Sequence, residues 1–217
     1  MLRIIAGERR GHKIEGPAAS SETRPTSDRV RESLFNILGE LVVDRLVIDL
    51  FAGTGALGLE ALSRGAARAL FVERDRKCVA LIHKNIATLR YEDRASVRLG
   101  DAYRWGGSFE SLEDRPIVAL LDPPYRDYES KGRRVHDLID EFMKRSPPGS
   151  VIALESGQAR DDQMLPEPEA WDVRRYGNTR IAIWLAKGAL ARDEGLPQTD
   201  SAEQSTPLDK DGSDVEL

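Results

Sequence analysis

Cysteine and histidine are scarce in this sequence of 217 residues, which contains one cysteine, Cys78, and three histidines. A single cysteine excludes an internal disulfide framework. His12, His83 and His136 are scattered, without cysteines or carboxylates at the spacing of a metal-binding motif. We therefore expect no metal site and, because no disulfide is needed, a cytoplasmic protein.

Long apolar runs are also missing, since none approaches the roughly 18–20 residues that a membrane-spanning helix needs. Charges at Arg3, Glu8, Arg9 and Arg10 interrupt the start of the chain before the apolar stretch of a signal peptide can develop. Hydrophobic residues make up 40% and charged residues 32%, which is typical of a soluble globular protein. We expect one main domain, without a membrane partner, that exists as a monomer.

The net charge of −5 combines two ends of opposite sign. The last stretch, 188–217, holds eight acids and two bases, which leaves a charge of +1 on residues 1–187. Residues 1–31 carry +3. A basic N-terminal end can hold phosphate, although an ordinary solvated surface explains the same charges equally well.

Composition divides the chain into three parts. Residues 1–26 are expected to form an N-terminal extension, with a small hairpin from Leu2 to Ile14 around the basic cluster and a loop after it. Residues 27–187 carry the periodic apolar patterns of a folded domain. Residues 188–217 are rich in Gly, Ser, Asp, Glu and Pro without apolar periodicity, which predicts a disordered acidic tail.

Strand and helix patterns alternate within residues 27–187. The expected strands are 46–51, 69–73, 95–99, 117–121 and 151–155, followed by a hairpin of 171–176 and 180–185. The expected helices are one capped by Thr26 or Ser27, one over 56–64, one capped by Asp75 and reaching Leu89, and one around 135–142. This alternation predicts an α/β fold, with a mostly parallel sheet covered on both faces and antiparallel pairing at one edge.

A glycine-rich turn follows the first of these strands. Gly53, Gly55 and Gly58 match the spacing G-x-G-x-x-G, which lets the backbone turn tightly and approach a ligand. Glu73 lies twenty residues after Gly53, where its carboxylate can accept both hydroxyls of a ribose. The motif alone suits a nicotinamide dinucleotide as well as S-adenosylmethionine (SAM), and a tight turn without a ligand also explains it.

Asp49 favours SAM over a dinucleotide. It ends an apolar strand, where an acid is expected only if it has a partner. The sulfonium and amino groups of SAM would be attracted to this carboxylate, whereas it would repel a pyrophosphate. Asp101, after the third strand, is placed to accept a hydrogen bond from an adenine amino group, although a turn residue would look the same.

A second loop, Asp122-Pro123-Pro124-Tyr125, follows the fourth strand at the edge where such sheets bind ligands. The two prolines remove backbone donors, so the carboxylate of Asp122 and backbone carbonyls remain as acceptors. Acceptors can orient an arylamine and stabilise the positive charge that develops on its nitrogen during methyl transfer. Tyr125 supplies a flat surface for an extruded base. Together with the glycine turn, this loop predicts a SAM-dependent methyltransferase acting on an exocyclic amino group of a base.

Four segments together resemble the RsmD family of bacterial ribosomal RNA methyltransferases over roughly residues 1–187. They are Arg3-Ile4-Ile5-Ala6-Gly7 with the following Arg9-Arg10-Gly11, Arg24 to Glu32, Asp49 to Gly65, and Asp122 to Tyr125. The resemblance implies a seven-stranded class I methyltransferase (Rossmann-like) sheet and methylation of guanine N2 in small-subunit (16S) ribosomal RNA. The partner would be ribosomal RNA within the small subunit or an assembly intermediate.

The resemblance also assigns the site residues. The SAM site would be lined by Asp49, Phe51, Gly53, Thr54, Gly55, Glu73, Asp101 and Ala102. The loop Asp122-Pro123-Pro124-Tyr125 would hold the guanine and carry the catalytic function. Arg9 and Arg10 of the basic N-terminal cluster, together with Arg24, Thr26 and Arg29, would bind RNA. The last three precede or begin a helix, whose first N–H groups can join arginines in holding phosphate; ordinary helix capping with surface charge also explains them.

Three other functions remain open. The acceptor loop suits adenine N6 in DNA or RNA equally well, although 217 residues leave no room for a sizeable target-recognition insertion. A nicotinamide-dependent oxidoreductase is disfavoured by Asp49 and by the acceptor loop. A non-catalytic RNA-binding assembly factor with the same fold would not need the intact acceptor loop.

Overall fold

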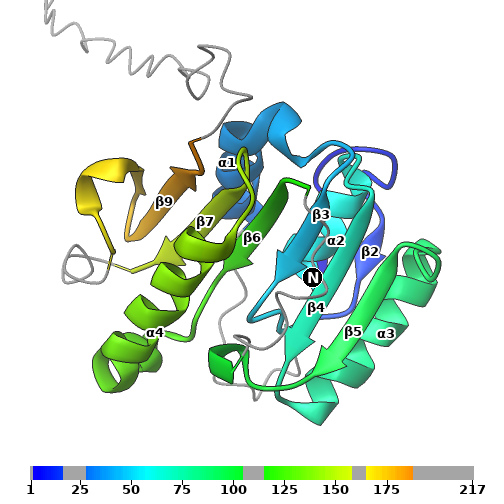
Figure 1. The fold of residues 1–217 in the computed structure, drawn as a ribbon. Helices are drawn as coiled ribbons and strands as arrows, with labels where there is room; N and C mark the ends of the chain where they lie inside the picture. The colour runs from blue at the N-terminus through cyan, green and yellow to red at the C-terminus, as the bar shows by residue number, and fades with distance from the viewer. Residues whose placement is uncertain (1, 17–27, 105–114, 158–164, 188–217) are drawn as a thin grey trace, which may run out of the picture.

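The computed structural model describes residues 2–16, 28–104, 115–157 and 165–187. A seven-stranded sheet forms its centre (Figure 1). The strands are β3 (Leu46–Asp49), β4 (Arg68–Glu73), β5 (Ala95–Leu99), β6 (Ile117–Leu121), β7 (Val151–Ser156), β8 (Trp171–Tyr176) and β9 (Thr179–Leu185). Their order is β5-β4-β3-β6-β7-β9-β8, with β9 antiparallel to both its neighbours and the remaining pairs parallel. The predicted fold class is confirmed.

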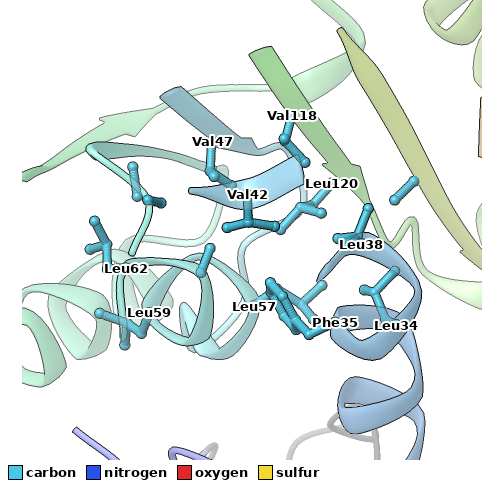
Figure 2. Packing of buried hydrophobic residues seen from close by; sticks show 14 of the residues in the cluster. Leu34, Phe35, Leu38, Val42, Val47, Leu57, Leu59, Leu62, Val118 and Leu120 are labelled. Atoms are coloured by element: carbon cyan, nitrogen blue, oxygen red, sulfur yellow. The ribbon is translucent and has the colours of Figure 1, made fainter. Parts of the chain in front are cut away.

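Helices cover both faces of this sheet (Figure 1). They are α1 (Asp28–Leu38), α2 (Ala56–Ser63), α3 (Arg76–Leu89) and α4 (Tyr125–Arg145), with short 3₁₀ turns η1 (Gly39–Val42) and η4 (Pro168–Ala170). Side chains alternate along each strand, so Val47 packs with α1, α2 and α3, whereas Ile48 packs with α4. Figure 2 shows Val47 of β3 and Leu120 of β6 with Leu38 of α1 in the first of these two cores.

Most element boundaries agree with the sequence patterns, and Asp75 caps α3 by accepting from the backbone N–H groups of Lys77 and Cys78. Two elements, β3 and α4, differ from their patterns by more than one residue. β3 ends at Asp49, because the chain turns there toward the glycine loop. α4 begins at Tyr125, ten residues before the apolar pattern that predicted it, directly after Pro124. The predicted caps Thr26 and Ser27 lie outside the described residues.

The N-terminal hairpin pairs β1 (Leu2–Arg3) with β2 (Lys13–Ile14), as predicted. Its apolar side chains Leu2 and Ile14 are buried in the same core as α1 and α2. The buried carboxylate of Glu60 in α2 accepts hydrogen bonds from the backbone N–H groups of Ile5 (2.8 Å) and Ala6 (3.0 Å). The hairpin is therefore held to the helices by buried polar contacts as well as by apolar packing.

Gly58 lies where α2 packs tightly against β4. A Cβ atom at this position would lie 2.3 Å from Cε1 of the buried Phe71. We therefore expect Gly58→Ala to lower the free energy of unfolding by about 1–3 kcal/mol through overpacking. Urea denaturation measures this, with Gly100→Ala as control because a Cβ there meets no atom within 4 Å. Equal midpoints for the two variants would contradict the packing role of Gly58.

Among the described residues, no helix is long and apolar enough to cross a membrane. The same residues contain no group of three or more His, Cys, Asp or Glu side chains that could hold a metal ion.

Candidate active site

Three acids meet at the carboxyl-terminal edge of the sheet. Asp49 ends β3, Glu73 ends β4, and Asp122 follows β6. β3 pairs with β4 on one side and with β6 on the other, so the strand order changes direction at this point (Figure 1). Parallel α/β sheets bind their ligands at such a switch point.

The glycine turn and the start of α2 donate backbone hydrogen bonds to two of these acids. Gly53 and Gly55 have φ values of 53° and 80°, which side chains with a Cβ atom rarely adopt. The backbone N–H of Gly53 donates to Oε2 of Glu73 (2.8 Å), and that of Gly58 donates to Oδ2 of Asp49 (3.0 Å). The predicted residues Asp49, Gly53, Gly55 and Glu73 are thus brought together around one turn.

Asp49 is the buried acid of this group, with only 1% of its surface exposed. Burial raises its pKa to about 7, and the charges of Asp122 and Glu73 act in the same direction, against the hydrogen bond from Gly58. Its second oxygen, Oδ1, is buried without a hydrogen-bond partner among the described residues. Such a carboxylate is suited to a cationic ligand that donates a hydrogen bond.

A second wall of the site comes from the turn after β5. Asp101 accepts from the backbone N–H of Tyr103 (3.2 Å) and pairs with Arg134 of α4 (3.3 Å). Ala102 is buried. Phe51, from the glycine turn, meets the ring of Tyr103 edge-on, with ring centroids 5.3 Å apart. The predicted residues Phe51, Asp101 and Ala102 are therefore linked through one unpredicted residue, Tyr103.

The acceptor loop leads directly into α4. Asp122 is half-buried and Pro123 is buried. Pro124 occupies the N-cap position with an extended ψ of 139°, and its carbonyl accepts from the backbone N–H of Asp127 (2.7 Å). The backbone of Tyr125 starts the helix, whereas its side chain lies outside the described part of the structure.

Of the residues predicted to bind RNA, Arg9 lies at the opposite end of α2 from the glycine turn. The backbone N–H of Arg9 donates to Ser63 Oγ at the far end of α2, roughly 12 Å along the helix from the glycine turn. The guanidinium of Arg9 lies over the ring of Tyr91, 5.7 Å from its centroid. Arg10 and Arg29 are exposed on the hairpin and on α1. Arg24 and Thr26 lie outside the described residues.

Sequence reasoning missed Asn85, which is fully buried in α3. Its side-chain NH2 group donates to the backbone carbonyls of Thr54 in the glycine turn (3.0 Å) and of Glu15 (3.0 Å). Its Oδ1 accepts from the backbone N–H of Glu15 (2.8 Å). It therefore ties the N-terminal hairpin to the glycine turn. A polar residue on the inward face of an amphipathic helix was the available signal.

This sheet order, with a glycine turn after its central strand and acids at the carboxyl ends, defines a class I methyltransferase fold. A family model described as "Conserved hypothetical protein 95" matches residues 2–185. The chain belongs to this family, the RsmD family of methyltransferases.

Individual relatives agree with this assignment. The "Ribosomal RNA small subunit methyltransferase D" of Haemophilus influenzae is 33% identical over 189 residues, which cover 84% of this chain and 91% of the relative. The solved structure of the yhhF protein of Escherichia coli matches with a TM-score of 0.66 at 35% identity, covering 86% of this chain and 98% of that one. An RNA methyltransferase of Salinibacter ruber, solved with S-adenosyl-L-homocysteine, shares the fold at 18% identity and a TM-score of 0.57, covering 81% of this chain and 100% of that one.

Proposed function

We propose that this protein transfers a methyl group from SAM to the exocyclic N2 of a guanine in small-subunit ribosomal RNA. Membership of the family and relatives named for ribosomal RNA methylation support the RNA substrate. The observation that carries the chemistry is the placement of Asp49 beside the acceptor loop of Asp122, with a buried oxygen that has no hydrogen-bond partner in the described part of the chain.

The chemistry of Asp49 and Glu73 on the cofactor side supports SAM as the ligand. When bound, SAM supplies an activated methyl group on a positively charged sulfur. Asp49 would hold its amino group through Oδ1 and would stabilise its positive charge. Glu73 uses each carboxylate oxygen for one backbone N–H, from Gly53 and Asp75, and retains lone pairs for ribose hydroxyls.

The rest of the cofactor would lie between the glycine turn and the turn after β5. Gly53, Thr54 and Gly55 would contact it through the backbone, and Phe51 and Ala102 would provide apolar contacts. Asp101 would accept from the adenine amino group through a carboxylate that already bonds Tyr103 and Arg134. A dinucleotide fits less well, because its pyrophosphate would face Asp49, Glu73 and Asp122 together.

The acceptor loop would orient the target amine. Asp122 and the Pro123 carbonyl would accept its two N–H groups, so that the nitrogen lone pair faces the methyl group. Asp122 would also stabilise the positive charge that develops on nitrogen, and the proton can leave during or after transfer. Tyr125 would stack on the base. This loop suits adenine as well, and the RsmD family assignment favours guanine.

Substrate class can be tested with methyl-labelled SAM. Under-methylated small ribosomal subunits and duplex DNA are incubated separately with the protein, and label in each nucleic acid is counted. We expect label in the subunit RNA. Label in duplex DNA instead would overturn the proposal, and label in neither would support a non-catalytic assembly factor. Thermal-shift measurements with SAM and NAD distinguish the two cofactors, with stabilisation expected from SAM alone.

A further inference from the structure

Asp127 is a buried acid that the proposed methyl transfer does not use. It lies in the first turn of α4, where its backbone N–H bonds the Pro124 carbonyl of the acceptor loop (2.7 Å). Its side chain, in a residue 2% exposed, accepts from the hydroxyl of Tyr103 (3.1 Å) and from Nζ of Lys131 (3.1 and 3.0 Å). A first-turn acid normally remains exposed, so these buried bonds indicate a specific role.

Tyr103 connects this acid with the cofactor side of the site. Its ring contacts Phe51 of the glycine turn, and its backbone N–H bonds Asp101. On α4, the guanidinium of Arg134 and Nζ of Lys131 lie 4.6 and 5.3 Å from the ring centroid. Burial, followed by the charge of Asp127, raises the pKa of the Tyr103 phenol, so this hydroxyl remains a donor.

A kink in α4 makes these contacts important for the position of the acceptor loop. Lys131 has φ −138° and ψ 24°, which breaks the helical geometry of α4 and separates residues 125–130 from the longer helix that packs on the sheet. The short segment is therefore positioned by its own contacts. The contacts of its described side chains include those of Asp127 with Tyr103 and Lys131. They also include those of Tyr128, which packs in the core and whose hydroxyl donates to the Glu155 carbonyl (2.7 Å).

We infer that Tyr103 and Asp127 are positioning residues that couple the cofactor side to the acceptor loop. The inference rests on the proposed function of that site. Contacts of the cofactor with Phe51 and Asp101 would restrain Tyr103, and Tyr103 would restrain the segment that begins at the acceptor loop. A misplacement of the target amine by about 1 Å is enough to slow in-line transfer, so loosening this segment lowers turnover without weakening cofactor binding.

The test replaces Tyr103 by phenylalanine, which removes the hydroxyl and keeps the ring. Hydrogen exchange of the peptide covering residues 122–130 is measured with and without SAM. We expect SAM to slow exchange at least about fivefold in the wild type and in the control Tyr176→Phe at the far edge of the sheet, but not in Tyr103→Phe. The SAM Kd is expected to be equal in all three. Protection that survives in Tyr103→Phe, or that is absent from the wild type, would overturn the inference.

Turnover on small subunits gives a second reading. Tyr103→Phe is expected to lower kcat about 10–100-fold, and the loss in the double variant with Asp127→Asn should be smaller than the product of the two single losses, because the hydroxyl and the carboxylate bond each other. Additive losses, or an unchanged kcat, would contradict the pairing. Failure of the proposed function is distinguishable: the wild type would then methylate no subunit RNA, while the exchange measurement would still report the coupling.

Discussion

Replacing Asp122 by alanine is expected to lower kcat about 100–1,000-fold while SAM binding is retained. The side chain is proposed to accept from the target amine and to stabilise the charge that develops on it, and loss of one such group costs a rate factor of this size. SAM binding should persist because Asp122 is not among the predicted cofactor residues. Its charge is also one cause of the raised pKa of Asp49, so its removal favours the ionised form of Asp49.

Single-turnover kinetics with small subunits measure the rate, and calorimetric titration measures the SAM Kd. Asp122→Asn is the matched variant, since it keeps an oxygen acceptor and removes the charge. We expect its rate to lie between those of the wild type and Asp122→Ala. Wild-type turnover in Asp122→Ala would refute the proposed role of the loop.

Asp49→Asn should weaken SAM binding by about 10–100-fold, because the bond to a charged amino group loses its charge assistance. An asparagine oxygen can still accept from the N–H of Gly58, so the glycine turn should keep its structure. The wild-type affinity should rise with pH up to about 7 and then level off, since SAM prefers the ionised carboxylate. Binding that does not change with pH from 6 to 8 would contradict this electrostatic role.

The same substitution should stabilise the protein when SAM is absent. The pKa of Asp49 is raised from 3.8 to about 7 on folding, so the folded state favours the protonated carboxyl. The stability that this preference adds is fully present below pH 3.8 and is lost as pH rises through 7. At pH 8 the wild type contains a buried charge that the variant lacks. Without SAM, we therefore expect Asp49→Asn to have a higher Tm than the wild type at pH 8, and the difference in Tm to be smaller at pH 5. A lower Tm for the variant at pH 8 would contradict this account.

Local sequence signals were sufficient for most elements of the fold. Ile117–Leu121 is uniformly apolar because β6 is central and buried on both faces. Asp75 could be identified as a cap because its side chain acts on N–H groups only two and three residues away. The acids Asp49 and Glu73 could be predicted as neighbours because they end strands on either side of the glycine turn.

The contacts that position the site depend on the tertiary fold, so local sequence patterns do not predict their partners. Tyr103 and Asp127 are 24 residues apart, and Asn85 reaches Glu15 across 70 residues, so only the strand order brings them together. The sequence does not predict the start of α4, because residues 125–131, between Pro124 and Gly132, have no apolar face of helical period. The buried pair of Arg31 and Glu60 resembled surface charge in the sequence.

The nucleoside product tests the account most directly. Wild-type protein is incubated with labelled SAM and under-methylated small ribosomal subunits, and the RNA is digested and analysed by mass spectrometry. We predict N2-methylguanosine as the labelled nucleoside, and its loss when Asp122→Ala replaces the wild type. Labelled N6-methyladenosine would contradict the assignment of guanine, and RNA without label would contradict the proposed reaction as a whole.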